Sequence, residues 1–295
     1  MKVALTGATG QLGRSLIEKA AVRDGFEIVA LGRAEVDLEQ PGSAAEAIAR
    51  LEPDVVVNAA AYTAVDQAEV EPDRAFRVNA EAPGEMASAA REIGASLIHI
   101  STDYVFDGRA KAPYREDSTT NPQNVYGRSK LAGEEQVREA NLNHLIVRTA
   151  WVYSPFGRNF VKTMMDAART RESLSVVADQ VGSPTSALDL ADALLALLEV
   201  WGAKPERGLG ETYHVAGSGQ TSWCGLAQAI MAECAALGVP TADVIGISTA
   251  DWPTKAVRPR NSVLDCEKFE RDFGIRMPDW QLSVAETVRR LAARQ

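Results

Sequence analysis

The N-terminal stretch Lys2-Val-Ala-Leu-Thr-Gly-Ala-Thr-Gly-Gln-Leu-Gly13 decides the fold of this chain. A short apolar run leads directly into Gly7, Gly10 and Gly13, and an amphipathic segment follows from about Gln11. Glycine permits positive φ and close approach of the backbone, and a helix N-terminus offers free N–H groups and a positive dipole end to an anion. The stretch therefore predicts a strand, a phosphate-binding turn made by Gly7, Gly10, Gln11, Leu12 and Gly13, and a helix, as in dinucleotide-binding domains.

Beyond this stretch, apolar strand-like runs alternate with helical patterns through about residue 150. The expected strands are Lys2–Leu5, Glu27–Leu31, Asp54–Asn58, Ser96–Ser101 and Asn143–Arg148. Such alternation predicts an α/β fold with a doubly wound, Rossmann-like parallel sheet over residues 1–150. Residues 151–295 break into shorter pieces rich in Gly, Pro, Ser and Thr. We expect them to form mainly a smaller C-terminal substrate-binding region, with chain crossings between the two parts.

Composition narrows the function. The 295 residues carry a net charge of −9 and no dense Lys/Arg run, which argues against nucleic acid as a partner. The three cysteines lack Cys-x-x-Cys spacing and suggest neither a disulfide framework nor a zinc site. The most apolar helical run, Ala187 to Val200, contains three carboxylates, and no signal-peptide core opens the chain. We expect a cytoplasmic protein with no membrane partner.

Tyr126 and Lys130 are the strongest catalytic candidates. Four residues apart on a helix, they project from one face. A nearby Lys cation favours the phenolate, so we expect it to lower the pKa of Tyr126 toward neutrality, where proton transfer is efficient. An isolated Tyr-x-x-x-Lys pair is usually structural, but the upstream glycine turn favours a nicotinamide-dependent oxidoreductase. The three histidines, His99, His144 and His214, lie in or beside apolar runs and are expected to be structural.

The residues after the second expected strand indicate whether the cofactor is NADPH or NADH. Arg33 follows Ala30-Leu-Gly, and a basic residue there suits the 2′-phosphate of NADPH, although a solvated loop arginine is about as common. We expect Asp37 and Leu38 to lie near the adenine or its ribose. The sequence favours NADPH, with NADH accepted.

Over nearly its whole length, the chain resembles the extended short-chain dehydrogenase/reductases, and within them the dTDP-4-dehydrorhamnose reductases. The resemblance rests on residues 6–13, 58–66, 101–108 and 126–130 and on Arg258-Pro-Arg-Asn-Ser262; the block from Asp103 to Gly108 is the most distinctive. It implies NAD(P)H-dependent reduction of the 4-keto group of dTDP-4-dehydro-L-rhamnose to dTDP-L-rhamnose. Fold and hydride chemistry do not fix the sugar, so another nucleotide-sugar reductase or epimerase stays open.

The resemblance also implies residue roles. Thr102, at the carboxyl end of an expected strand, would hold the ketone oxygen. Tyr126 would give that oxygen a proton, and Lys130 would bind the nicotinamide ribose. The alternative for Thr102 is an ordinary strand terminus or helix cap. The loop beside the cofactor would be Asn58, Ala59, Ala60, Ala61, Tyr62 and Thr63. The nucleotide sugar would contact Val65, Thr102, Asp103, Tyr104 and Trp151, with Asn159 and Arg258 on its diphosphate side.

Two further expectations concern partners. Some members of the family hold magnesium at a dimer interface through an acidic residue after the glycine turn, where this chain has Ser15. We therefore expect no metal and a monomer or weak homodimer. A different class of function is the regulatory subunit of methionine adenosyltransferase, which resembles the same family; the presence of Thr102, Tyr126 and Lys130 makes it the second choice.

Overall fold

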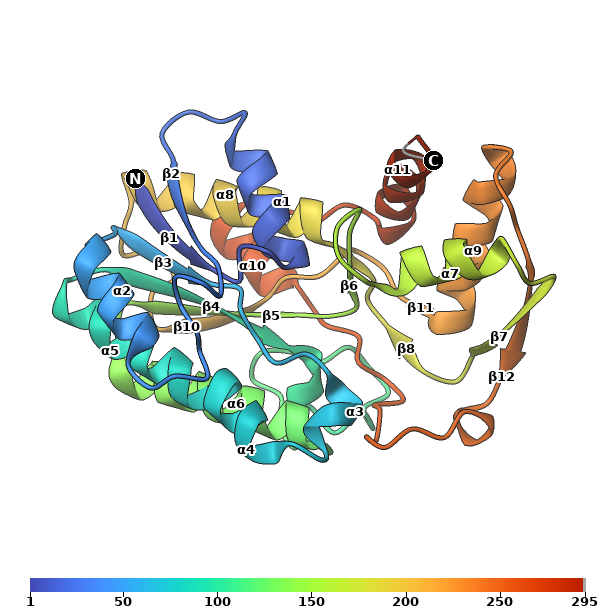
Figure 1. The fold of residues 1–295 in the computed structure, drawn as a ribbon, viewed down its shortest axis with the longest axis horizontal. Coiled ribbons are helices and arrows are strands. Elements are labelled where there is room, and N and C mark those ends of the chain that lie inside the picture. The colour runs from blue at the N-terminus through green and yellow to red at the C-terminus, as the bar shows by residue number, and fades with distance from the viewer. Residues whose placement is uncertain (294–295) are drawn as a thin grey trace.

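The computed structural model describes residues 1–293 and places a six-stranded parallel sheet at the centre of the larger part of the molecule (Figure 1). Its order is β10-β5-β4-β3-β1-β2. The strands are β1 (Lys2–Thr6), β2 (Glu27–Leu31), β3 (Val55–Asn58), β4 (Ser96–Thr102), β5 (His144–Thr149) and β10 (Glu211–His214). Every pair in the sheet is parallel. The predicted α/β class with a doubly wound parallel sheet is confirmed.

Helices cover both faces of this sheet, because each central strand sends apolar side chains alternately to either side. Val3 and Leu5 pack toward one face, covered by α1 (Gln11–Ala20), α8 (Ala187–Ala203) and α10 (Glu267–Phe273). Ala4 packs toward the other, covered by α2 (Ser43–Leu51), α5 (Ala82–Glu92) and α6 (Val125–Ala140). Two short helices, α3 (Val65–Ala68) and α4 (Pro72–Phe76), lie beside α6, and a π-helical turn at Arg77–Glu81 joins α4 to α5.

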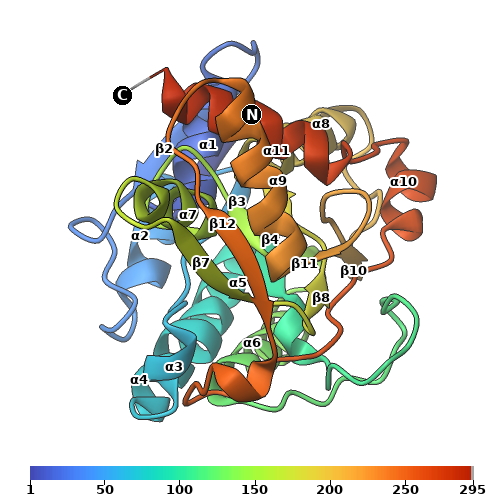
Figure 2. The same ribbon diagram turned by 90° about the vertical axis from the view of Figure 1, so that its right-hand side faces the viewer.

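The remaining elements form a smaller part beside the carboxyl ends of the strands. Its own core lies among α7 (Phe160–Ala168), α9 (Trp223–Ala236) and α11 (Trp280–Ala292). Strand β7 (Ser173–Val177) pairs in parallel with β12 (Asp243–Ile247), as Figure 2 shows. Shorter pairs are β6 (Val152–Tyr153) with β9 (Thr185–Ser186) and β8 (Val181–Gly182) with β11 (Thr221–Ser222).

The chain crosses between these two parts more than once. Helix α8 packs against α1, and β10 adds to the central sheet beside β5, although both come after residue 151. The five strands expected from the sequence are present with their ends within one residue, whereas β10 was not predicted. In residues 1–293, no helix combines the length and apolar character needed to span a membrane.

Candidate functional site

A pocket of about 770 Å³ opens at the carboxyl ends of the central strands and continues toward the smaller part. In open α/β sheets, ligands bind at this edge, near the point where the strand order reverses. That point here lies between β1 and β3. The pocket lining includes most of the predicted residues: Gly7, Gly10, Gln11, Leu12, Arg33, Asp37, Leu38, Ala59, Ala60, Ala61, Thr63, Val65, Thr102, Asp103, Tyr104, Tyr126, Lys130 and Trp151.

The glycine turn forms one end of the pocket for steric reasons. Gly7 has a φ of +70°, and a Cβ there would lie 2.6 Å from the backbone nitrogen of Ala60. A Cβ on Gly13 would lie 2.3 Å from the Gly7 carbonyl oxygen, so the first turn of α1 packs directly on the loop. Gly10 precedes α1 without a side-chain cap. The N-terminal N–H groups of α1 are therefore open to an anion in the pocket.

Helix α6 carries the tyrosine and the lysine. It begins after Asn124, whose side chain accepts a hydrogen bond from the Gly127 N–H at 2.8 Å. The amide of Asn124 also donates to the Val257 carbonyl at 2.8 Å. The Val125 N–H donates to the Glu69 carboxylate at 2.7 Å. Charged and polar groups thus fix the first turn of α6, where Tyr126 lies.

Tyr126 does not have the lowered pKa that the Tyr-x-x-x-Lys spacing suggested. Burial raises the pKa of its phenol to about 12, and hydrogen bonding with Thr102 opposes this only in part. The expectation was wrong because desolvation of the phenolate dominates. The phenol is consequently protonated at neutral pH, which is the form that donates a proton. The rings of Tyr126 and Tyr104 meet edge to face, with centroids 5.5 Å apart.

Lys130 is almost completely buried, and its ammonium or amine nitrogen has two protein partners. Nζ donates to the Ile100 carbonyl at 2.7 Å and lies 3.3 Å from His99 Nε2. Burial lowers the pKa of Lys130 to about 8, although the neighbouring Glu134 carboxylate raises it. Lys130 therefore changes its protonation state close to neutral pH.

Thr102 and Asp103 stand at the end of β4, at the floor of the pocket. The Thr102 hydroxyl donates to Asp103 Oδ1 at 2.9 Å and accepts from the Tyr104 N–H at 3.2 Å. Thr102 thus caps the short helical turn Asp103–Val105 as well as facing Tyr126. Burial raises the pKa of the Asp103 carboxyl to about 6, against hydrogen bonds from Ser262 and Thr102.

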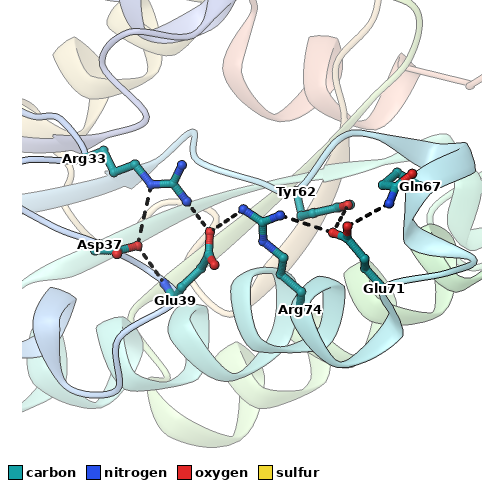
Figure 3. A network of polar contacts seen from close by, with 7 residues as sticks. All are labelled: Arg33, Asp37, Glu39, Tyr62, Gln67, Glu71 and Arg74. Carbon is teal, nitrogen blue, oxygen red and sulfur yellow. Dashed lines mark hydrogen bonds and ion pairs between the residues drawn. The ribbon is translucent and has the colours of Figure 1, made fainter.

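The opposite end of the pocket carries a chain of alternating charges, drawn in Figure 3. Arg33 pairs with Glu39, and its Nε lies 3.7 Å from Asp37 Oδ1. The same Glu39 oxygen accepts from Arg74 Nη2 at 2.7 Å. Figure 3 shows the Glu39 carboxylate between the two guanidinium groups. Arg33 and Glu39 both line the pocket. Arg74, outside the lining, shares the Glu39 carboxylate with Arg33.

Five predicted residues lie outside the pocket lining: Gly13, Asn58, Tyr62, Asn159 and Arg258. Gly13 supports the turn from behind. The Tyr62 phenol donates to Glu71 at 2.7 Å. Asn159 caps α7 and donates to Gln11 and to the carbonyls of Ser154 and Phe156.

Arg258, proposed for the diphosphate side, is held by a carboxylate in this structure. Its guanidinium binds Asp66 with two contacts, at 3.2 and 2.7 Å. This pair lowers the pKa of Asp66 below its usual value. The bidentate geometry is the one that a guanidinium also offers to a phosphate.

Sequence reasoning missed Trp223, which lines the pocket from α9 and faces Trp151. Trp151 has a φ of +47°, an uncommon conformation for a residue other than glycine. Its indole N–H donates to the Ser262 hydroxyl at 3.2 Å. Strained backbone of this kind clusters at ligand sites. No local signal pointed to Trp223, because the fold brings it to Trp151 from a distant segment.

The absence of an acidic residue at position 15 leaves a buried serine whose hydroxyl donates to the Gln11 carbonyl at 2.8 Å. Within the described residues 1–293, no cluster of three or more His, Cys, Asp or Glu is placed to hold a metal ion.

The residues present fit a nicotinamide dinucleotide. One continuous pocket joins an uncapped helix N-terminus, a basic side chain at the end of β2, and a protonated phenol beside a lysine. These are the groups that a pyrophosphate, a ribose phosphate and a hydride-transfer centre require.

Comparison with known proteins gives the same picture. The family model described as RmlD substrate binding domain matches residues 1–293. A dTDP-4-dehydrorhamnose reductase of Sinorhizobium fredii is 45% identical over 291 residues, covering 99% of this chain and 96% of the relative.

Solved structures agree. That of a dTDP-4-dehydrorhamnose reductase ortholog from Clostridium acetobutylicum superimposes with a TM-score of 0.91 at 37% identity, covering 99% of this chain and 100% of that one. A dTDP-4-dehydrorhamnose reductase from Bacillus anthracis, solved in complex with NADP, gives a TM-score of 0.90 at 35% identity, covering 98% and 99%. The resemblance drawn from the sequence motifs is confirmed.

Proposed function

The chain belongs to the RmlD substrate binding domain family, and on that premise we propose that it reduces the 4-keto group of dTDP-4-dehydro-L-rhamnose with NADPH, giving dTDP-L-rhamnose. The observation that carries the proposal is the meeting of Thr102, Tyr126 and Lys130 in the pocket that also contains the glycine turn. A pocket with both features serves a redox reaction better than a regulatory role.

The cofactor would lie along the carboxyl edge of the sheet. The turn at Gly7 and Gly10 and the N-terminus of α1 would hold its pyrophosphate, and Arg33 its 2′-phosphate. The segment Ala59 to Thr63 would pass beside it. Lys130 would bind the nicotinamide ribose. When bound, the nicotinamide supplies the hydride that the protein cannot provide.

Tyr126 would act as the general acid. Its phenol is protonated at neutral pH, so it can pass a proton to the oxygen of C4 as that oxygen gains negative charge. Thr102 would position the same oxygen by hydrogen bonding. The phenolate left behind is stabilised by a cationic Lys130 and regains its proton from solvent. The 4-keto group thereby gains one hydride on carbon and one proton on oxygen.

The nucleotide sugar would occupy the part of the pocket nearest to the smaller core. Val65, Asp103 and Tyr104 line the pocket, together with Trp151 and Trp223. The stacked indoles offer an apolar face to a sugar or a base. Arg258 would reach the diphosphate by exchanging one of its contacts with Asp66 for a phosphate oxygen, and Asn159 would support that side by holding α7.

The test is the sugar-dependent loss of NADPH absorbance with purified protein. Consumption that requires dTDP-4-dehydro-L-rhamnose supports the proposal, and dTDP-L-rhamnose is the product to identify. NADPH binding without consumption would contradict it and favour a regulatory role. We further propose a monomer or weak homodimer in the cytoplasm, where reducing conditions keep Cys224, Cys234 and Cys266 as thiols.

A further inference from the structure

A buried chain of polar side chains runs from β1 through β3 and β4 to the lysine of α6. Thr6, Asn58, His99 and Lys130 are each at most 2% exposed. Thr6 Oγ1 lies 2.8 Å from Asn58 Oδ1. Asn58 Nδ2 lies 3.1 Å from His99 Nδ1. Because these side chains are buried, each donor in the chain needs an acceptor.

The orientation of the Asn58 amide is determined by a backbone group. The Ala60 N–H, which can only donate, points at Asn58 Oδ1 from 3.2 Å. The Thr6 hydroxyl also donates to this atom. If the amide were turned over, its NH2 group would face the Ala60 N–H, and two donors would meet. The Asn58 NH2 group must therefore point toward His99.

That orientation selects one tautomer of His99. Nδ1 faces an N–H donor, so it must accept and carries no proton. Burial lowers the pKa of His99 well below its usual value, so the ring is neutral. A neutral imidazole has one N–H, which is then on Nε2. His99 Nε2–H points at Lys130 Nζ, 3.3 Å away.

If Lys130 were an ammonium, one of its N–H groups would face the His99 Nε2–H, and two donors would meet. A neutral amine, by contrast, accepts from His99 through its lone pair and still donates to the Ile100 carbonyl. We propose that His99 is a positioning residue, locked by Asn58 in the Nε2–H tautomer, which favours the neutral amine of Lys130 when no cofactor is bound and makes cofactor binding take up a proton at Lys130.

Cofactor binding and protonation of Lys130 are coupled because the cofactor changes the hydrogen-bond partners of Nζ. The ribose hydroxyl oxygens and the Tyr126 oxygen accept hydrogen bonds from an ammonium, whereas His99 Nε2–H does not. A cofactor that draws Nζ away from His99 therefore favours the charged form, and solvent supplies the proton. Four other ionisable groups lie near this pair. Glu134 on α6 acts on Lys130, and Arg138 on α6 and His144 on β5 act on His99. Arg148 on β5 is paired with Glu134.

This inference rests on the proposed function only for the place of Lys130 beside the cofactor. Its first test needs no substrate. The chain has three histidines, so ¹⁵N-histidine labelling and long-range ¹H–¹⁵N correlation resolve each ring, and the His99→Asn variant identifies the His99 signals. We expect a neutral ring protonated on Nε2 at every pH from about 6 to 9. A proton on Nδ1, or an imidazolium, would overturn the inference.

The second test reverses the hydrogen bonds with an isosteric change. In Asn58→Asp, one carboxylate oxygen still accepts from Thr6 and Ala60, but the other can accept only from an N–H on His99 Nδ1. Nε2 then becomes an acceptor and stabilises the Lys130 ammonium. Asn143→Asp is the matched control, because Asn143 is exposed at the amino end of β5, away from the pocket.

The readout is proton uptake on NADPH binding, measured by calorimetry in buffers of different ionisation enthalpy. At about pH 8.5 we expect uptake of up to about three quarters of a proton per NADPH in the wild type and in Asn143→Asp, and nearly none in Asn58→Asp or Lys130→Met. Equal uptake in Asn58→Asp and the wild type would contradict the proposal. If Asn58→Asp does not fold, the proposal is still tested by the tautomer of His99 in the wild type and by the difference in proton uptake between the wild type and Lys130→Met.

The tests separate this inference from the proposed function. Failure of sugar reduction with an Nε2–H tautomer would count only against the function. Normal reduction with an Nδ1–H tautomer would count only against the role of His99.

Discussion

The indole of Trp151 lies flat on the indole of Trp223, with ring centroids 3.5 Å apart and planes inclined by 6°. Trp151 follows β5 of the central sheet, and Trp223 begins α9 of the smaller part. Both rings line the pocket. The stack therefore joins the two parts of the molecule at the end of the pocket assigned to the nucleotide sugar.

Trp223→Ala should weaken binding of the nucleotide sugar. An aromatic pair contributes about 0.5–1.5 kcal/mol beyond its buried area, which corresponds to a rise in KM of roughly 2- to 10-fold. NADPH affinity should not change, since the glycine turn is untouched. Steady-state kinetics and NADPH titration measure the two effects. Trp252→Ala is the control, because Trp252 is 57% exposed; equal effects in both variants would refute the assignment.

Tyr126→Phe should remove the proton donor while keeping the ring and its edge contact with Tyr104. Loss of a positioned general acid lowers kcat by about 10²- to 10⁴-fold. The dissociation constant of NADPH should stay nearly the same, which fluorescence titration can determine. Turnover close to that of the wild type would rule out Tyr126 as the acid.

The cofactor preference should respond to the charges at Arg33. Arg33→Ala should raise the dissociation constant of NADPH about 10- to 150-fold and leave that of NADH nearly unchanged, because charge-assisted hydrogen bonds contribute about 1.5–3 kcal/mol. Glu39→Gln should tighten NADPH binding, since its carboxylate competes for the same guanidinium.

Arg115→Ala is the matched control for this pair of variants, because Arg115 is 68% exposed and Arg33 69%. Arg115 lies outside the pocket. A parallel loss of NADPH and NADH affinity in Arg33→Ala would show that the guanidinium does not recognise the 2′-phosphate.

The stability of the protein should depend on pH through Asp103. Burial raises the pKa of this carboxyl from 3.8 to about 6. The folded state then binds this proton more tightly than the unfolded state, so the contribution of Asp103 to the free energy of unfolding falls as pH rises from about 4 to about 6 and is level above. Asp103→Asn lacks this loss, and its stability relative to the wild type should grow over that range, by up to about 3 kcal/mol.

Urea denaturation of both proteins between about pH 4.5 and 7 measures this difference. Asp117→Asn, at a carboxyl that is 76% exposed, should show no such trend. A stability difference between Asp103→Asn and the wild type that does not vary with pH would contradict the raised pKa.

The local parts of the fold were readable from the sequence. Glu27–Leu31 is a strand with the predicted bounds, and α1 begins at Gln11 as expected. The strand follows from apolar patterning, and the start of α1 follows from the glycine turn, where Gly7 has a φ of +70° and a Cβ would clash with the backbone. Strand β10 was missed because Glu211-Thr-Tyr-His214 is short and polar at both ends. Pairing with β5 makes it a strand, and that pairing is a tertiary contact.

The features of the candidate site also fall into those that follow from local sequence and those that depend on tertiary contacts. The Tyr126 and Lys130 spacing and the position of Thr102 after β4 are local properties, and the structure brings these residues to one pocket. The raised pKa of Tyr126 depends on burial by distant segments, and the stack of Trp151 on Trp223 depends on α9. His99 was expected to be structural; only the three-dimensional contacts with Asn58 and Lys130 reveal its hydrogen-bond direction.

The central claim is hydride transfer to C4 of the sugar in the pocket of Thr102, Tyr126 and Lys130. The most direct measurement uses NADPH carrying deuterium at the transferred position and dTDP-4-dehydro-L-rhamnose, with NMR of the product. The account predicts dTDP-L-rhamnose with deuterium on C4, formed by the wild type and lost in Tyr126→Phe. A product without deuterium at C4, or unchanged NADPH beside an epimerised sugar, would contradict it.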